Sequence, residues 1–303
     1  MSGRYAPSPT AALHLGNLRT ALVAWLLART SGRAFHLRVE DLDTPRVAAA
    51  GATGAGQLAD LAALGIDFDG PPMVQSERLD AYAAAARHLP LYECYCTRRE
   101  IAEAASAPHG SGHRPYPGTC RDLPETERAR LRRVRPPALR VRADAAAMTI
   151  SDLWAGKVTG VVDDFVVRRG DGVWAYNFAC VVDDIAQGVD QVCRGDDLLA
   201  SAPRQAWLTA LLGARPPEYA HVGLAVNPDG QRLAKRDGAV TLADLRAKGH
   251  SVDDVRSLLA ASLGLADPGE PVTMGQLADR FDPATLRHGT WIVDPVGART
   301  PAT

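Results

Sequence analysis

The stretch that decides the fold reads Arg-Tyr-Ala-Pro-Ser-Pro-Thr over residues 4–10 and His-Leu-Gly-Asn over residues 14–17. Residues 3–6 are typical of a short strand, which the two prolines of the motif end, because proline has no backbone N–H to give to a sheet. Apolar residues then recur at helical spacing, at Leu15, Leu18, Leu22, Trp25 and Leu26. We expect this helix to end near Gly32. The stretch therefore predicts a strand, a turn and a helix in succession.

The next segments continue this alternation of strands and helices. Residues 35–40, Phe-His-Leu-Arg-Val-Glu, alternate as a strand does, and alanine-rich helical segments follow at about 53–64 and 77–88. A β-α-β-α order is typical of helices packed on a parallel sheet. We therefore predict an α/β fold with a doubly wound, Rossmann-like sheet.

The second half of the chain is expected to alternate in the same way. Strand-like segments lie at 138–142, 165–169 and 174–182. After Gly238 the pattern turns helical, with Ser251 as the expected N-cap of a helix. The apolar face of that helix would carry Leu258, Leu259 and Leu263. The end of the chain, rich in Pro, Gly and Thr, is expected to form a loose tail.

The composition sets the class of protein. The 303 residues are 46% hydrophobic and 23% charged, which is typical of a globular chain with one large or two medium domains. No leader pattern and no long apolar stretch is present, so we expect neither secretion nor a membrane span. Five cysteines without a disulfide-like spacing favour the reducing cytoplasm, and Cys180 and Cys193 lie in apolar segments where we expect burial. A net charge of −1 gives no argument in favour of nucleic-acid binding.

The residues at the start of the first helix are candidates for binding phosphate. Gly16 would let the backbone approach a ligand closely, and a helix start offers N–H groups and a positive dipole to an anion. His14 could donate a hydrogen bond to a phosphate oxygen. A His-x-Gly sequence at a helix start is also common in proteins where it has no binding function, so the surrounding motifs decide whether it binds phosphate here.

Two arginines and a glutamate are candidates for binding an acidic amino acid. A guanidinium group matches a carboxylate through two parallel hydrogen bonds, so Arg4 and Arg194 together favour an acidic side chain. Glu40, at the end of the second expected strand, could bind the ammonium group of the substrate. Tyr176 could hydrogen-bond to the substrate or form a wall of its pocket.

A second basic motif, Arg-Leu-Ala-Lys-Arg-Asp-Gly, occupies residues 232–238. Turn-forming residues at 227–230 frame it as a loop that could close over a ligand. Its cations Arg232 and Lys235 would share the negative charge that develops on phosphate groups. Taken alone, the motif is more typical of a basic turn exposed to water.

Three cysteines predict a metal site within residues 90–125, a segment rich in Cys, Tyr, Gly and Pro that we expect to be an insertion. They are Cys94, Cys96 and Cys120. Thiolates are soft ligands, and zinc binds four ligands as a tetrahedron. By chemistry alone, His109 and His113 are conventional candidates for the fourth ligand. The alternative to a metal site is that these are surface cysteines of a loop that bind no metal.

Taken together and in this order, the motifs resemble the class I aminoacyl-tRNA synthetases of the glutamyl and glutaminyl branch. Residues 14–17 resemble the His-Ile-Gly-His motif that holds ATP in that class, with Asn17 in place of its last histidine. Residues 232–236 resemble its Lys-Met-Ser-Lys-Ser loop, with Lys235 as the second lysine and Ala234 in place of the first serine. The resemblance covers most of residues 3–245.

The resemblance implies a role for each motif. It implies that His14 and Lys235 are catalytic. For glutamate it implies Arg4, Tyr5, Ala6, Pro7, Ser8, Glu40, Tyr176 and Arg194. For ATP, bound with Mg²⁺, it implies His14, Gly16, Asn17, Arg232 and Lys235. For one structural zinc ion it implies Cys94, Cys96, Cys120 and the oxygen of Tyr116, with His113 left open as a competitor.

Only residues 239–303 follow the lysine loop, and we expect them to be too few for an anticodon-binding domain. The chain therefore resembles the short members of the branch, which activate glutamate with ATP without tRNA and transfer it to queuosine at the first anticodon position of tRNA(Asp). The expected domains are a catalytic domain at 1–245 and a small helical, stem-contact-like region with a loose tail at 246–303. The expected partners are ATP, L-glutamate and the anticodon arm of tRNA(Asp), and we expect a monomer.

Two other functions stay open at this point. A conventional member of the branch would charge the 3′ end of tRNA(Glu). An inactive, synthetase-like binding module is the second, because Asn17 and Ala234 depart from the motifs of the family. The many arginines at 114–142 are either contacts for RNA phosphates or a helix face exposed to water.

Overall fold

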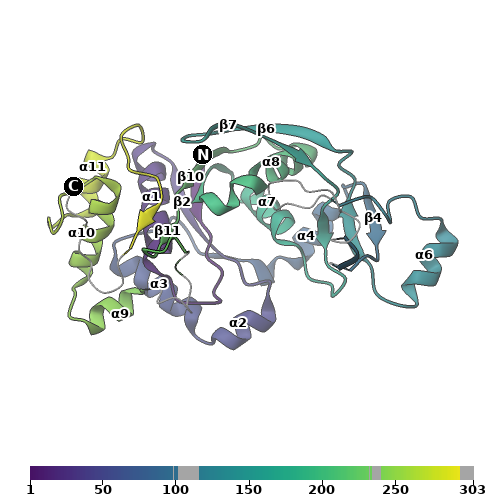
Figure 1. The fold of residues 1–303 in the computed structure, drawn as a ribbon, viewed down its shortest axis with the longest axis horizontal. Helices are drawn as coiled ribbons and strands as arrows, with labels where there is room; N and C mark the ends of the chain where they lie inside the picture. Colours follow the sequence, from purple (N-terminus) through teal and green to yellow (C-terminus); the bar gives the residue numbers. More distant parts are fainter. Residues whose placement is uncertain (98, 102–115, 232, 234–239, 294–303) are drawn as a thin grey trace.

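A seven-stranded sheet forms the centre of the protein in a computed structural model, which describes residues 1–97, 99–101, 116–231, 233 and 240–293 (Figure 1). The strand order is β3-β2-β1-β9-β10-β6-β7. The strands are β1 (Ser2–Tyr5), β2 (Ala34–Val39), β3 (Met73–Val74), β6 (Ala146–Asp152), β7 (Gly156–Val162), β9 (Val189–Gly195) and β10 (Glu218–Val222). Neighbouring strands are parallel except β6 and β7, which form an antiparallel hairpin at one edge.

Helices cover both faces of the sheet because successive side chains of a strand point to opposite faces. In β1, Tyr5 packs into the core with helix α1 (Leu15–Thr30), whereas Arg4 pairs with Asp184 of helix α7 (Tyr176–Ala186). Helix α8 (Ala202–Leu211) packs against α7 and against the hairpin. The doubly wound α/β fold predicted from the sequence is confirmed, with one antiparallel edge strand added.

A second, three-stranded antiparallel sheet carries the cysteine-rich insertion at the end of the molecule opposite α10 (Figure 1). Its strands are β4 (Leu91–Cys94), β5 (Ala138–Val141) and β8 (Val166–Arg168), and helix α6 (Glu125–Arg132) follows the described part of the insertion. Helices α2 (Thr44–Ala50) and α3 (Thr53–Ala63) lie in sequence between β2 and β3, and the 3-10 turn η1 (Gln75–Glu77) and α4 (Leu79–Ala86) lie between β3 and β4. The remaining helices are η2 (Asp196–Ser201), α9 (Leu242–Ala247), α10 (Val252–Leu263) and α11 (Met274–Arg280).

Most of the expected elements are confirmed, and one is wrong. Ser251 caps α10 as predicted, since its side chain accepts a hydrogen bond from the backbone N–H of Asp254. The strand expected at 174–182 is instead helix α7. Residues 178–182 are apolar without a gap, and such a run fits a buried helix as well as a buried strand. The tail expected beyond residue 293 lies outside the described residues. Within the described part of the chain, no helix has the length and apolar character that a membrane crossing requires.

The residues after position 245 pack into the same hydrophobic core as α1, and strand β12 (Trp291–Ile292) pairs with β11 (Ala225–Val226). Arg19 of α1 is fully buried and joins these parts, because it donates to the carbonyl oxygens of Gly223, Arg287 and Gly289. The domain boundary expected at residue 245, between the catalytic domain and the helical region that follows it, stays a prediction.

Gly223 lies where two backbones touch, and this contact predicts a large effect of adding one methyl group. A Cβ at position 223 would lie 2.3 Å from the carbonyl carbon of Gly289, and neither backbone can move aside as a side chain would. We expect Gly223→Ala to lower the free energy of unfolding by about 2–3 kcal/mol. Gly56→Ala is the control, since a Cβ there meets nothing within 4 Å. Urea denaturation with equal midpoints for the two variants would contradict the expectation.

Candidate functional site

A cavity of about 710 Å³ opens at the carboxyl ends of β1, β2 and β9. In an open parallel sheet, ligands bind at the carboxyl ends of the strands, at the point where the strand order reverses. This point lies between β1 and β9, because β1 is followed by β2 on one side and β9 is followed by β10 on the other. The topology therefore places the ligand site where the cavity lies.

The cavity brings together the expected amino-acid and nucleotide residues that the structure describes. These lining residues are Arg4, Tyr5, Ala6, Pro7, Ser8, His14, Gly16, Asn17, Glu40, Tyr176 and Arg194. Arg232 and Lys235 lie outside the described residues. Leu233, between them in the sequence, is buried and lines the cavity.

His14 forms the N-terminal cap of helix α1. Its Nδ1 accepts hydrogen bonds from the backbone N–H groups of Gly16, at 3.1 Å, and Asn17, at 3.4 Å. Since Nδ1 is an acceptor, a neutral His14 ring carries its proton on Nε2. The structure thus differs from the expectation of N–H groups open to phosphate, because the ring already occupies two of them.

Asn17 and Gly16 have local structural reasons to stand at their positions. The Oδ1 atom of Asn17 accepts a hydrogen bond of 3.2 Å from the backbone N–H of His14, which closes a capping box. A Cβ at position 16 would lie 2.8 Å from Cβ of Ala225 and 3.0 Å from Cε1 of His14. The amide at position 17, a departure from the family motif, therefore stabilises the turn that presents His14.

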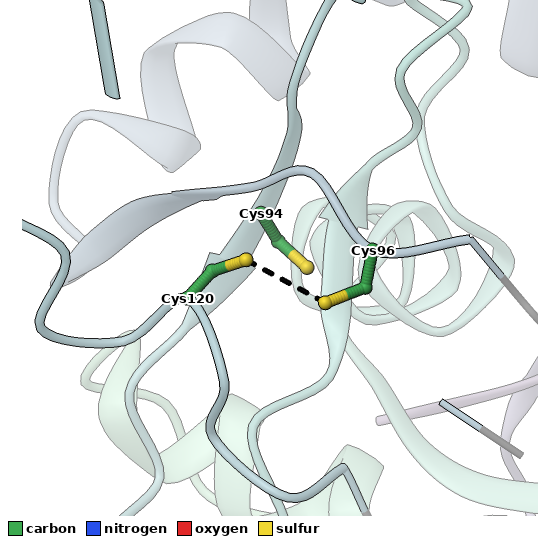
Figure 2. A group of neighbouring side chains, drawn as sticks. All are labelled: Cys94, Cys96 and Cys120. Atoms are coloured by element: carbon green, nitrogen blue, oxygen red, sulfur yellow. Dashed lines mark hydrogen bonds between the residues drawn. The ribbon is translucent and has the colours of Figure 1, made fainter. Parts of the chain in front are cut away.

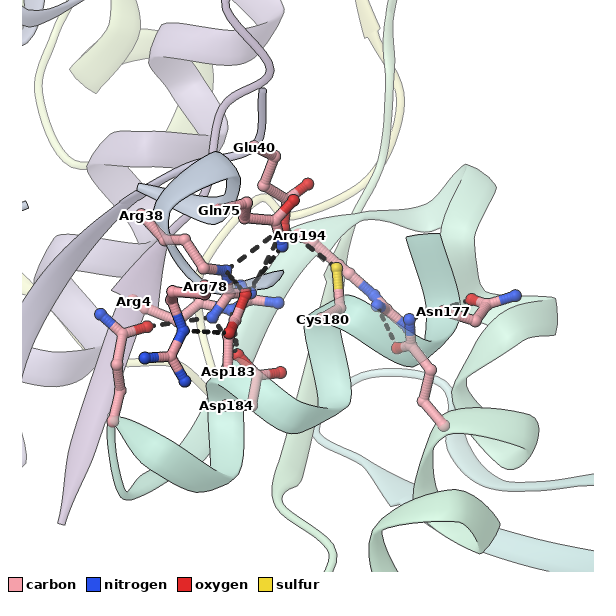
Figure 3. A network of polar contacts seen from close by, with 12 residues as sticks. Arg4, Arg38, Glu40, Gln75, Arg78, Asn177, Cys180, Asp183, Asp184 and Arg194 are labelled. Atoms are coloured by element: carbon pink, nitrogen blue, oxygen red, sulfur yellow. Dashed lines mark hydrogen bonds and ion pairs between the residues drawn. The ribbon is translucent and has the colours of Figure 1, made fainter. Parts of the chain in front are cut away.

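Arg4 is buried on the face of the sheet that α7 covers (Figure 3). Its Nε donates to Oδ1 of Asp184 at 3.3 Å, and its Nη1 donates to the carbonyl oxygen of Cys193 at 3.1 Å. Asp184 also accepts a hydrogen bond of 2.7 Å from Arg38. Burial alone would raise the pKa of Asp184, but the charges of Arg38 and Arg4 lower it, so the carboxylate stays ionised.

Glu40 is held from two sides at the rim of this network. Arg38 donates to its Oε1 at 3.3 Å, and the Cys180 thiol donates to the same oxygen at 3.0 Å (Figure 3). Burial and the neighbouring Glu40 charge raise the pKa of Cys180 well above its ordinary value, so the thiol keeps its proton. The expected burial of both Cys180 and Cys193 is confirmed.

Arg194 is fixed by three acceptors. Its Nε donates to Nε2 of His221 at 3.1 Å, its Nη1 to Oε1 of Gln205 at 2.6 Å, and its Nη2 to the carbonyl oxygen of Leu198 at 3.3 Å. Neither His221 nor Gln205 could be predicted from the sequence. No local signal marks them, since each lies in a buried element far from any motif.

Two further residues of the site were also missed. Asp184 anchors Arg4, and Gln57 of α3 donates to the carbonyl oxygens of Ser8, at 3.0 Å, and Ala11, at 2.6 Å. Gln57 thereby fixes the loop that follows β1. A glutamine in an alanine-rich helix gives no sign of such a role.

Tyr176, which was predicted from the sequence, lies at the start of α7, lines the cavity and is 41% exposed.

Three cysteine side chains gather between β4 and the described end of the insertion (Figure 2). The Sγ atoms of Cys94, Cys96 and Cys120 lie within 4.8 Å of one another. The Tyr116 hydroxyl lies 3.4 Å from Sγ of Cys94 and 3.7 Å from Sγ of Cys96. This group could hold a metal ion. His109 and His113 lie outside the described residues.

The arginines of residues 116–142 are mostly paired with acids. Arg128 pairs with Glu125, Arg130 with Glu127, Arg132 with Glu93 and Glu125, and Arg142 with Asp122. Arg140 is buried, and its guanidinium lies 3.8 Å from the centre of the Tyr116 ring. This pairing favours a self-neutralised surface exposed to water over a contact for RNA phosphates. Arg114 lies outside the described residues.

Comparisons with known proteins agree on one family. The model of the family described as tRNA synthetases class I (E and Q), catalytic domain, matches residues 1–283. A protein of Nocardia farcinica named glutamyl-Q tRNA(Asp) synthetase is 58% identical over 99% of this chain and 96% of its own length. A protein of the same name from Cutibacterium acnes is 54% identical over 89% of this chain and 78% of its own length.

A solved structure supports the fold. The glutamate tRNA ligase of Elizabethkingia meningosepticum, crystallised in complex with its amino acid, is 27% identical with a TM-score of 0.78. The match covers 95% of this chain and 66% of that one.

Proposed function

The chain belongs to the class I tRNA synthetases of the E and Q type, and from this we propose that it activates glutamate with ATP and transfers it to queuosine in tRNA(Asp). The observation that carries the proposal is the 58% identity, over nearly the whole chain, to a protein named glutamyl-Q tRNA(Asp) synthetase. The chemistry of the cavity is consistent with it, because two arginines complement the side-chain carboxylate of glutamate and Glu40 complements its ammonium group.

In the first step, an α-carboxylate oxygen of glutamate attacks the α-phosphorus of ATP. A bond forms between this oxygen and phosphorus, the bond from phosphorus to the bridging oxygen breaks, and pyrophosphate leaves. The protein positions the reactants and neutralises charge, and it needs no nucleophile of its own. Arg4 and Arg194 bind the side-chain carboxylate, with Tyr5, Ala6, Pro7 and Ser8 around it and Tyr176 as a wall. Glu40 binds the ammonium group.

The nucleotide end of the site is assigned to the start of α1 and to the lysine loop. His14 donates from Nε2 to a phosphate oxygen while its Nδ1 keeps the helix cap, and Gly16 and Asn17 lie beneath the nucleotide. Arg232 and Lys235 neutralise the charge that develops on pyrophosphate. Mg²⁺, which arrives with ATP, supplies further charge neutralisation.

In the second step, a hydroxyl oxygen of the cyclopentene diol of queuosine attacks the carbonyl carbon of the glutamyl-adenylate. An ester bond forms, the bond from carbon to the phosphate oxygen breaks, and AMP leaves while the hydroxyl proton passes to solvent. The partner is the anticodon arm of tRNA(Asp). We propose that the protein acts as a monomer in the cytoplasm, where its five free cysteines stay reduced.

ATP–pyrophosphate exchange without tRNA is the experiment that tests the proposal. Glutamate is expected to support exchange, and aspartate and glutamine are not. The charged product is then expected with queuosine-containing tRNA(Asp) and not with tRNA(Glu). Charging of tRNA(Glu) at its 3′ end would favour a conventional synthetase. An absence of exchange, with and without tRNA, would favour an inactive binding module.

We propose further that the cysteine cluster holds one structural zinc ion, with Tyr116 as the fourth ligand. The donor set fits zinc, since three thiolates and a phenol oxygen lie around one point. Strand β4 and residues 116–120 come from opposite ends of the insertion, so the metal would join them. We expect a metal chelator to lower the temperature of unfolding by about 5–10 °C.

Metal analysis of variants separates the candidates for the fourth ligand. One zinc per chain is expected in the wild-type protein and none in Cys120→Ser, which should also be insensitive to chelator. Tyr116→Phe is expected to bind zinc more weakly, whereas His113→Ala keeps it. Loss of zinc in His113→Ala but not in Tyr116→Phe would reverse the assignment.

A further inference from the structure

A chain of hydrogen bonds runs sideways across three neighbouring strands and ends at Arg194. Asp152 closes β6, His221 lies in β10, and Arg194 lies in β9 directly opposite His221 in the parallel register. His221 Nδ1 lies 2.6 Å from Oδ2 of Asp152, and Arg194 Nε donates to His221 Nε2 at 3.1 Å. All three side chains are buried.

The two hydrogen bonds of His221 fix its protonation. Nε2 must accept, because Nε of Arg194 always carries a proton. The single proton of the ring is therefore on Nδ1, where it is donated to Asp152. Asp152 is itself held, since its other oxygen accepts from the backbone N–H groups of Trp154, at 3.0 Å, and Ala155, at 2.8 Å.

The acceptors around Arg194 are all neutral, which sets it apart from the other arginines of the network. Arg4 and Arg38 each pair with the carboxylate of Asp184, whereas no carboxylate of the described residues lies within ion-pair distance of Arg194. A neutral acceptor orients a guanidinium without cancelling its charge. Arg194 thus lines the cavity as an oriented cation whose charge remains available to a substrate carboxylate.

We propose that Asp152 and His221 are positioning residues, which hold Arg194 in the orientation that binds the side-chain carboxylate of the amino-acid substrate. The inference rests on the proposed function, because it deepens the assignment of Arg194 to glutamate. Asp152 selects the Nδ1–H tautomer of His221, and this tautomer presents Nε2 as the acceptor for Arg194.

A dependence on pH follows from this arrangement. Protonation of His221 would place an N–H group at Nε2 against the N–H group of Arg194. Burial lowers the pKa of His221 below 6.5, and the charges of Arg194 and Arg4 lower it further, although Asp152 opposes them. The ring of Tyr219 stacks on that of His221, with the two ring centres 6.0 Å apart. The neutral form, present above that pKa, is the one that orients Arg194, so we expect the KM for glutamate to rise as acid protonates His221.

Asp152→Asn is the sharpest test, because it reverses the tautomer without changing the shape. The amide oxygen of the new side chain can keep the two backbone hydrogen bonds, so its NH₂ group faces His221 and forces Nδ1 to accept. The proton then lies on Nε2 and Arg194 loses its acceptor. We expect the KM for glutamate in pyrophosphate exchange to rise by about 10- to 100-fold, with the KM for ATP and the unfolding midpoint nearly unchanged.

Two further variants keep the proposal testable. His221→Gln keeps a neutral acceptor for Arg194 without a titratable ring, so it is expected to retain most glutamate affinity and to lose the rise of KM in acid. Asp164→Asn is the matched control, a buried acid outside the cavity that likewise accepts a backbone N–H, from Ala143 at 2.8 Å. It is expected to leave the KM for glutamate unchanged.

The outcomes separate this inference from the proposed function. A wild-type protein without glutamate-dependent exchange would overturn the proposed function itself. An active wild type whose glutamate KM is the same in Asp152→Asn would overturn the positioning role alone. So would equal increases in the KM for glutamate and ATP, because they would indicate general damage to the cavity.

Discussion

Replacing Arg4 with alanine is expected to lower kcat/KM for glutamate in ATP–pyrophosphate exchange by about 100- to 1,000-fold. The change removes one of the two cations proposed to bind the side-chain carboxylate. It is expected to leave the fold intact, because Asp184 keeps its hydrogen bond of 2.7 Å from Arg38 and so is not left as an unpaired buried charge. The loss should therefore appear in the kinetics and not in the unfolding midpoint.

Arg33→Ala is the control for this variant. Arg33 directly precedes β2, at the opposite end of the strand from the cavity, and does not line the cavity. It pairs with Asp190 and Glu218. Exchange by this variant should equal that of the wild type. A normal rate in Arg4→Ala with glutamate would remove Arg4 from the amino-acid site. Arg4→Lys is expected to fall between the two, since lysine keeps the charge and loses the planar fork.

Asp183→Ala is expected to lower the free energy of unfolding by about 3–5 kcal/mol, which is a large part of the stability of a typical domain. Asp183 is fully buried and collects donors from the segment after β3 (Figure 3). Its carboxylate accepts from Arg78 at 2.6 Å, from Gln75 at 2.8 Å and from the Tyr82 hydroxyl at 2.8 Å. Alanine would leave these donors without an acceptor and open a void between α7 and α4.

Urea denaturation measures this effect, with Tyr82→Phe as the matched variant. Phenylalanine removes only the hydroxyl donor and leaves Asp183 bound by Arg78 and Gln75, so a loss of about 1 kcal/mol is expected. A similar loss in both variants would mean that the hydroxyl contact, and not the charge pairing, stabilises this part of the fold.

Many of the residues proposed to touch ligand or metal could be predicted from the sequence, because they lie in short local motifs. Residues 4–8 and 14–17 come from one strand-turn-helix segment, and Cys94, Cys96 and Cys120 lie in one insertion. The structure brings each of these groups together as the motif spacing suggested. The loop carrying Arg232 and Lys235 stays a prediction, since both residues lie outside the described part of the chain.

The residues that hold the proposed ligand-binding groups in place could not be predicted. Asp152 and His221 meet only because β6, β10 and β9 are neighbours in the sheet, and strand order is not visible in a single sequence. Likewise, the strand predicted at 174–182 is wrong because the unbroken apolar run at 178–182 fits either element, and the helix α7 observed there packs against α4 and α8.

The central position of strand β1 affects how the protein is made. Its partner on one side, β2, is translated soon after it, but on the other side Ser2 pairs with Val189. A ribosome adds roughly 5–20 residues per second, so the second edge of β1 waits roughly 10–40 s for its partner. During that time the growing chain exposes an unpaired, buried-type strand edge, the kind of surface that chaperones cover. Every message cut short before β9 therefore yields a chain that has the proposed ATP motif at residues 14–17 but lacks the strand that completes the cavity.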